Sequence, residues 1–164
     1  MKVLVIYDSV FGNTEQIALA IGNAFGSQED IAMLRVGDVK PEHFVGLKLL
    51  IVGSPTQRFR PTAAISQYLK GIPHNHLKGV KVAAFDTRLT MREINNTPVL
   101  AFFVRISGDS AYAAKHIAEL LKKNGGQLSV PPEGFFVDGM KGPLVQGEME
   151  RAADWAKKII AETL

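Results

Sequence analysis

The sequence contains no cysteine among its 164 residues. This absence excludes disulfide bonds, thiolate metal sites and cysteine nucleophiles, and it is typical of a cytoplasmic protein. The chain also lacks any apolar run near the roughly 20 residues that a membrane-spanning helix requires. Met1 and Lys2 lead directly into a short strand-like run. We therefore expect no signal peptide, no anchor and no membrane insertion.

The chain has only a small excess of positive charge and few histidines. The formal net charge is only +3, and the lysines and arginines are scattered along the chain. A nucleic-acid-binding surface is therefore not expected. None of the four histidines has a spaced acidic or metal-type companion. We accordingly assign no catalytic residue of the hydrolase type and no metal ligand.

Apolar residues are abundant, at 46 % of the chain against 21 % charged residues. They suffice for the hydrophobic core of one domain, which we expect to span residues 1–164. Strand-like runs alternate with segments of helical spacing. The runs predict strands at 2–7, 30–36, 47–53 and 80–86, and a fifth at 127–130 and 135–137 that Pro131-Pro132 interrupts. Helical spacing predicts helices over 13–26, 61–70, 109–124 and 147–162. Right-handed crossovers then give one parallel sheet with helices on both faces.

The segment 88–108 does not fit this alternation of strands and helices. It is longer than most loops inside compact domains, and it contains the apolar run Val99-Leu-Ala-Phe-Phe-Val104. A short helix, an added strand and a lid all remain open, and a contact with a second subunit is an equal alternative.

Ligands of a parallel sheet bind beyond the carboxyl ends of its strands, which directs attention to the loops that follow strands one, three and four. In the first loop, Ser9, Asn13 and Thr14 offer side-chain donors, and Gly12 lets a ligand approach the backbone. Free N–H groups at the start of the next helix favour an anion. The loop therefore suits a phosphate, although Asn13 as a helix cap in a capping box with Gln16 explains it equally well.

Other phosphate motifs are absent. The chain has no Gly-x-x-x-x-Gly-Lys-Ser/Thr and no Gly-x-Gly-x-x-Gly after its first strand. A nucleoside triphosphatase and a dinucleotide fold are thus both disfavoured. A receiver-type signalling domain is disfavoured too, because the predicted third strand ends in Gly53-Ser54 where that reading needs an aspartate.

The sequence resembles the flavodoxin family. Ser9-Val-Phe-Gly-Asn-Thr14 is similar to the phosphate loop of that family, Gly53-Ser-Pro-Thr56 to its second flavin loop, and residues 142–155 to the approach to its last helix. The resemblance spans nearly the whole chain. It implies a doubly wound, five-stranded parallel sheet in the order 2-1-3-4-5 with helices on both faces, and FMN as cofactor.

The resemblance also implies where FMN would bind. Residues 9–14 would surround the phosphate with help from the Ser54 hydroxyl, and Thr56 to Arg60 would lie along one face of the ring. Asp86 to Leu89, as the loop after the fourth strand, would approach the pyrimidine edge with backbone N–H groups. The implied site residues are Ser9, Val10, Phe11, Gly12, Asn13, Thr14, Ser54, Pro55, Thr56, Gln57, Arg58, Phe59, Asp86, Thr87, Arg88 and Leu89.

The chain departs from the family pattern in several places. Phe11 stands where the family usually has threonine, and Phe59 is the only aromatic residue in the second loop. Phe59 either stacks on the ring or points into the core. Residues 54–62 contain no glycine. A peptide flip beside the flavin requires a positive φ angle, which residues other than glycine adopt at a cost of roughly 1–2 kcal/mol, so we expect the neutral flavin semiquinone to be stabilised less than in typical members of the family. Arginines stand near the ring loops of a mildly basic chain, whereas the family's electron carriers tend to be acidic.

The resemblance implies an FMN-binding protein that carries electrons between redox partners. The basic residues predict a partner with an acidic docking surface. A small FMN-dependent NAD(P)H:quinone-type reductase is the alternative from the enzyme class, and an electron carrier is favoured over a stand-alone oxidoreductase. A flavodoxin-like domain without cofactor is the third reading, and self-association through 88–108 remains open.

Overall fold

The computed structural model describes residues 1–27 and 30–163. Its strands are β1 (Lys2–Tyr7), β2 (Asp30–Arg35), β3 (Leu49–Pro55), β4 (Lys81–Leu89), β5 (Gln127–Leu128) and β6 (Glu133–Val137). Its α-helices are α1 (Asn13–Asn23), α2 (Ala63–Gly71), α3 (Met91–Asn95), α4 (Pro98–Ser107), α5 (Ala113–Lys123) and α6 (Glu148–Thr163). Short 3-10 helices follow β2, at Val36–Asp38 and Pro41–Phe44, and precede α5, at Gly108–Ala111.

The sheet is parallel throughout and runs in the order β2-β1-β3-β4-β5, with β6 also paired to β4. The predicted order 2-1-3-4-5 is therefore confirmed, and so is the division of the fifth strand. Its first piece pairs Lys81 with Gln127 and its second pairs Phe85 with Glu133. Pro131-Pro132 lies between the two pieces, where no ladder hydrogen bond has to be donated.

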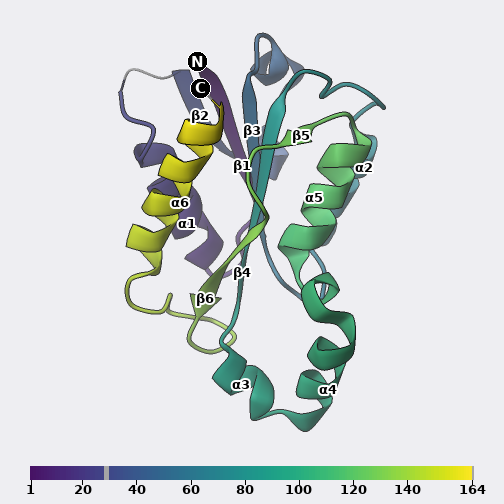
Figure 1. Cartoon of the computed structure of the whole chain (residues 1–164), viewed down its shortest axis with the longest axis vertical. Helices are drawn as coiled ribbons and strands as arrows, with labels where there is room; N and C mark the ends of the chain where they lie inside the picture. The colour runs from purple at the N-terminus through teal and green to yellow at the C-terminus, as the bar shows by residue number, and fades with distance from the viewer. Residues whose placement is uncertain (28–29, 164) are drawn as a thin grey trace.

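Helices cover both faces of the sheet, α1 and α6 on one side and α2 and α5 on the other (Figure 1). Strands β1 and β3 are buried on both faces, which explains their uninterrupted apolar sequences. Under α6, Phe85, Phe135 and Trp155 meet edge-to-face with ring centroids 6.0–6.2 Å apart. The only tryptophan, Trp155, is thus a core residue and does not line the cleft that opens at the sheet's carboxyl edge.

Several boundaries differ from the prediction. The third strand ends at Pro55 and so includes Ser54 and Pro55, and the helix predicted from residue 109 begins at Ala113. The fourth strand does not end at residue 86 but continues to Leu89, because β6 pairs with Thr87, Arg88 and Leu89. These three residues, expected in a loop, are therefore strand residues. Helix α2 begins at Ala63 and not at Pro61, because the Thr62 hydroxyl caps it by accepting from the Ile65 N–H at 3.4 Å.

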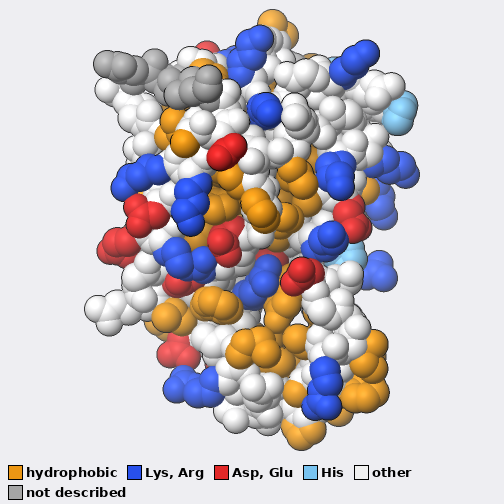
Figure 2. Space-filling model, in the orientation of Figure 1, with side chains coloured by type: hydrophobic (Ala, Val, Ile, Leu, Met, Phe, Trp, Pro, Cys, Tyr) orange, Lys and Arg blue, Asp and Glu red, His pale blue; other side chains and the backbone are white. Residues whose placement is uncertain are grey.

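The segment 88–108 forms two helices rather than a strand. Helices α3 and α4 project beyond the carboxyl edge of the sheet, at the lower end of Figure 1. No residue of α4 is buried, and apolar side chains gather at this end of the molecule (Figure 2). Within residues 1–27 and 30–163, no helix combines the length and the apolar character needed to cross a membrane.

Candidate functional site

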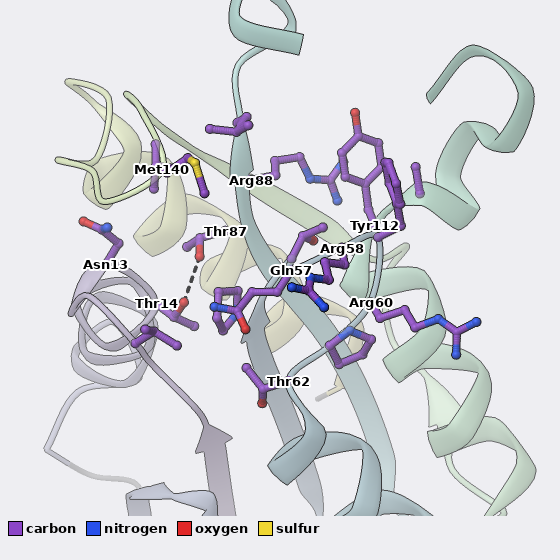
Figure 3. Close-up of a pocket in the computed structure, with 18 of the residues that line it drawn as sticks. Asn13, Thr14, Gln57, Arg58, Arg60, Thr62, Thr87, Arg88, Tyr112 and Met140 are labelled. Atoms are coloured by element: carbon purple, nitrogen blue, oxygen red, sulfur yellow. Dashed lines mark hydrogen bonds between the residues drawn. The ribbon is translucent and has the colours of Figure 1, made fainter. Parts of the chain in front are cut away.

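A cleft of about 1010 Å³ opens at the carboxyl edge of the sheet. The loops after β1 and β3, the end of β4 and the α3–α4 extension all contribute to its walls (Figure 3). Most of the predicted site residues line it: Val10, Phe11, Asn13, Thr14, Pro55, Thr56, Gln57, Arg58, Phe59, Thr87, Arg88 and Leu89. Four lie behind the walls instead: Ser9, Gly12, Ser54 and Asp86. The structure thus brings together segments from four parts of the chain.

Hydrogen bonds to the Ser9 side chain fix the conformation of the loop after β1. Gly12 takes a left-handed φ of +90° immediately before α1, a conformation that glycine adopts without a steric penalty. The Ser9 hydroxyl oxygen accepts from the N–H groups of Gly12 at 3.1 Å and Glu15 at 3.3 Å. Ser9 therefore folds back onto the loop and fixes its shape from inside.

Four backbone N–H groups of this loop, those of Val10, Phe11, Asn13 and Thr14, donate to no acceptor among the described residues, and two of the four belong to the start of α1. Asn13 and Thr14 are the first two residues of α1, so their N–H groups have no partner inside the helix. Among the residues that the structure describes, neither N–H donates to any acceptor, although both residues are buried. Unpaired N–H groups at the start of an 11-residue helix form an anion-binding position.

The side chains of these two residues turn away from the helix end. The Asn13 amide donates to the Lys141 carbonyl at 3.0 Å, and α1 has no side-chain cap. The prediction that Asn13 forms a capping box with Gln16 was therefore wrong, because the loop after β6 supplies a better acceptor. The Thr14 hydroxyl pairs with the Thr87 hydroxyl at 2.8 Å, which ties the first loop to β4 (Figure 3).

Phe11, the residue that departs from the family pattern, does not fill this position. Its side chain and that of Val10 are each 51 % exposed and lie at the mouth of the cleft. Since the hydroxyl expected at position 11 is replaced by an aromatic ring, the loop offers an anion its amides more than its side chains.

The loop after β3 folds as a tight hairpin. Gln57 and Arg60 exchange both backbone hydrogen bonds, at 2.9 and 3.0 Å. The two residues between them, Arg58 and Phe59, have φ angles of +49° and +67°. Such two-residue turns strongly prefer Asn-Gly. The loop without glycine therefore holds two side chains at positive φ angles, in a strained conformation.

This hairpin places Phe59 against the extension. The rings of Phe59 and Phe103 of α4 lie 5.7 Å apart between centroids, and Phe103 in turn contacts Phe102 at 6.0 Å. Phe59 therefore points neither into the core nor freely into solvent. It closes the outer side of the cleft, which α4 extends with Leu100 and Val104.

A buried ion pair lies behind the opposite wall. Asp86 is fully buried, and Arg88 binds both of its carboxylate oxygens at 2.7 Å. The N–H of Ala114, at the start of α5, also donates to Asp86 at 2.9 Å. Burial raises the pKa of the Asp86 carboxyl, while the Arg88 guanidinium and the Ala114 N–H oppose that rise. Gly134 leaves the space for Arg88, since a Cβ there would collide with the guanidinium.

Arg88 also stacks on the ring of Tyr112, a residue that was not predicted to belong to the site. Its guanidinium carbon lies 3.7 Å from the centroid of Tyr112, and both residues line the cleft (Figure 3). Tyr112 stands directly before α5, outside the loops considered. Stacking of this kind strengthens an ion pair that is already desolvated.

Sequence reasoning also missed other parts of the walls. Helix α2 and the residues before it, helices α3 and α4, the 3-10 helix before α5, the end of β6 and the loop after β6 contribute Pro61, Thr62, Ala63, Ser66, Lys70, Ile94, Leu100, Val104, Ala111, Val137 and Met140. Only the apolar run of 88–108 carried a signal for any of them. In the described residues, no group of three or more His, Cys, Asp or Glu is arranged to hold a metal ion.

The fold is that of solved flavodoxins. A flavodoxin from the domain Archaea superposes with a TM-score of 0.75 at 21 % identity, covering 99 % of each chain. Flavodoxin 2 from Bacillus cereus gives 0.75 at 18 % identity and 99 % coverage of both chains. A flavodoxin, WrbA-like protein from Agrobacterium tumefaciens gives 0.67 at 15 % identity, covering 98 % of this chain and 96 % of its own. No protein-family model matches the sequence, and no curated protein matches it significantly.

Proposed function

We propose that this chain, which has the flavodoxin fold, binds FMN in the cleft at the carboxyl edge of its sheet and acts as an electron carrier. The observation that carries the proposal is the pair of unpaired N–H groups of Asn13 and Thr14 at the start of α1. A 5′-phosphate is a dianion of the size that such a helix start accepts. Bound flavin would supply the redox chemistry, and the protein would bind, orient and tune it.

The residues present fit this cofactor. The cleft volume of about 1010 Å³ reaches the upper end of the range of roughly 300–1,000 Å³ typical of small-molecule sites. Phe59 and Leu89 give the cleft apolar surface for a planar ring, and both line it beside the phosphate loop. In this arrangement loop 9–14 holds the phosphate, and the hairpin 57–60 and the end of β4 flank the ring. Thr14 links the two regions through its hydrogen bond to Thr87.

The test is an FMN titration of the apoprotein followed by flavin fluorescence. We expect Thr14→Ala to weaken FMN binding about tenfold or more, because it removes the hydroxyl that ties the phosphate loop to β4 through Thr87 and that could instead donate to a phosphate, where a hydrogen bond to a charged group contributes about 1.5–3 kcal/mol. Thr97→Ala is the matched control, since Thr97 is exposed and its side chain makes no cap hydrogen bond. A purified protein without affinity for FMN would overturn the proposal and favour a domain that works without cofactor.

Electron transfer to a protein partner is the finer part of the proposal. Arg58 and Arg92 are exposed near the mouth of the cleft and the extension, so a partner with an acidic docking surface would be attracted. Reduction rates measured with an acidic and with a basic redox protein should differ, and the advantage of the acidic partner should fall as salt is added. A cytoplasmic location stays a prediction from the lack of cysteine.

The large cleft favours a second candidate, a small FMN-dependent NAD(P)H:quinone-type reductase. A volume of about 1010 Å³ leaves room for a second small molecule beside a flavin ring. Steady-state oxidation of NAD(P)H by the purified protein, with a quinone as acceptor, separates the two candidates. Turnover would favour the reductase, and reduction only by a protein partner would favour the carrier.

Self-association through 88–108 also stays a prediction. The exposed apolar side chains of α4 are Val99, Phe102, Phe103 and Ile106, with exposures of 47–69 %. Arg105 is the only charged residue of α4, so two copies of this face would meet with little charge repulsion. Sedimentation velocity over a range of protein concentrations tests this prediction.

A further inference from the structure

A second groove, of about 310 Å³, continues from the cleft along the outer surface between α2 and α5. Arg60, Pro61, Ser66 and Lys70 line both hollows. In Figure 3, Arg60 extends from the hairpin toward the green ribbon of α5. Further along, α5 contributes His116, Glu119, Leu120 and Lys123 to the groove. The two hollows are thus neighbours with a shared wall.

The cations of this groove lack anionic partners. Arg60, Lys70 and Lys123 are exposed, and in the described part of the chain none of them forms an ion pair with a carboxylate. The one acidic residue of the groove, Glu119, is itself paired with Lys115 at 3.7 Å. The groove therefore presents three cations that form no ion pair with any described residue, against one carboxylate that pairs with a lysine outside the groove lining, on two helices and an anchored hairpin.

We propose that this groove binds the phosphate-bearing adenosine end of a nicotinamide dinucleotide whose planar end enters the cleft. This inference rests on the second candidate function, that of a reductase, and names where its reductant binds. Phosphate groups are the natural counterparts of several unpaired cations at one place. A ligand with an anionic end and a flat end matches a basic groove that shares a wall with an apolar cleft.

The size of the groove favours a small ligand over a protein surface. A stable protein interface buries about 1,200–2,000 Å² in total, whereas a concave volume of about 310 Å³ falls at the lower end of the range for small-molecule sites. The cations also sit inside a groove between two helices and not on a convex face. A phosphorylated nucleotide therefore fits better than an acidic protein.

The experiment uses calorimetry on the purified protein, with NADPH and with adenosine 2′,5′-bisphosphate as a redox-inactive fragment. We expect both ligands to bind, with affinities that fall as salt is raised. Lys123→Glu should weaken the binding of both at least tenfold. Lys122→Glu is the matched control, because Lys122 is the exposed neighbour in the same turn and does not line the groove. It introduces the same charge and should change both affinities less than threefold.

The outcomes separate this inference from the binding of FMN. FMN affinity should be the same in Lys123→Glu as in the unaltered protein, since Lys123 does not line the cleft. The proposed groove site would be wrong if Lys123→Glu left the affinity for the fragment unchanged. It would also be wrong if Lys122→Glu lowered that affinity as much as Lys123→Glu does. A protein that binds neither nucleotide but captures an acidic redox protein through Lys123 would overturn it too. If FMN fails to bind while the fragment still binds through Lys123, the groove stands and the proposed cofactor falls.

Discussion

The cleft has two walls of opposite character. The inner wall consists of loop 9–14 and the end of β4, and the outer wall consists of hairpin 57–60 and α4. In the inner wall, polar groups are buried and paired: Thr14 with Thr87, and Asp86 with Arg88. In the outer wall, Arg58 and Phe59 hold positive φ angles, and the side chains of α4 are apolar and exposed.

The difference indicates what each wall contributes. The inner wall pairs its buried side chains and leaves backbone N–H groups of loop 9–14, among them those of Asn13 and Thr14, for a ligand, so it is preorganised and contributes to stability. The outer wall carries local strain and exposed apolar surface, and Phe59 packs on Phe103 there. Such violations of local preference concentrate at functional sites. We therefore expect substitutions in the inner wall to lower stability, and FMN affinity where they alter loop 9–14, and those in the outer wall to relieve strain or to affect association.

The largest effect should come from the ion pair behind the inner wall. Asp86→Ala would leave the Arg88 guanidinium and the Ala114 N–H without their buried acceptor. Breaking one partner of a buried ion pair costs about 3–5 kcal/mol, so the urea midpoint should fall sharply. Asp138→Ala is the control, because its pair with Arg92 is exposed and spans 3.7 Å, and it should cost less than about 1 kcal/mol. Equal losses of stability in Asp86→Ala and Asp138→Ala would contradict the view that the buried ion pair stabilises the inner wall.

The next effect should be of opposite sign and lie in the outer wall. Replacing Arg58 by Asn and Phe59 by Gly gives the hairpin the residues that a turn with two positive φ angles prefers. We expect a gain of about 2 kcal/mol in the free energy of unfolding, since each strained residue costs roughly 1–2 kcal/mol. Asn75→Gly is the control: Asn75 has a φ of +63° outside the cleft, and asparagine already tolerates it. A double variant that is less stable would show that Phe59 contributes more by packing on Phe103 than it costs in strain.

The two walls also differ in how much of their structure the sequence predicts. The inner wall follows from local pattern, since an apolar strand followed by Ser9 and Gly12 predicts a loop that opens onto a helix start. The sheet order and the divided fifth strand were predicted as well, from the family resemblance and from Pro131-Pro132. The loop and the divided strand follow from short stretches of sequence, whereas the sheet order came from the resemblance.

The missed features depend on contacts distant in sequence. Thr87, Arg88 and Leu89 are strand residues only because β6 arrives beside them. Tyr112 enters the site because Arg88 stacks on it, and Asn13 leaves the helix end because Lys141 offers a carbonyl. The positive φ angles of Arg58 and Phe59 contradict their own preferences. No local rule predicts any of these outcomes.

A smaller effect should separate backbone geometry from side-chain space at the inner wall. A Cβ at Gly12 would meet no atom within 4 Å, so Gly12→Ala tests only the left-handed φ of +90°. We expect a loss of about 1 kcal/mol in stability and a weaker affinity for FMN as the loop relaxes. Gly71→Ala, where a Cβ also has open space but φ is not left-handed, should be neutral or slightly stabilising. Identical behaviour of the two variants would remove the special role of Gly12.

The smallest change in monomer stability should accompany Phe102→Ser on α4. Phe102 is 56 % exposed, and surface substitutions of this kind usually stay within about 0.5 kcal/mol. Phe103→Ser should cost more, about 0.5–1.5 kcal/mol, because it also removes the ring contact with Phe59. If α4 serves association, sedimentation should detect a loss of self-association in Phe102→Ser although unfolding by urea hardly changes. A large loss of stability in Phe102→Ser would instead mean that the exposed helix supports the fold, and the contrast between a stabilising inner wall and a functional outer wall would fail.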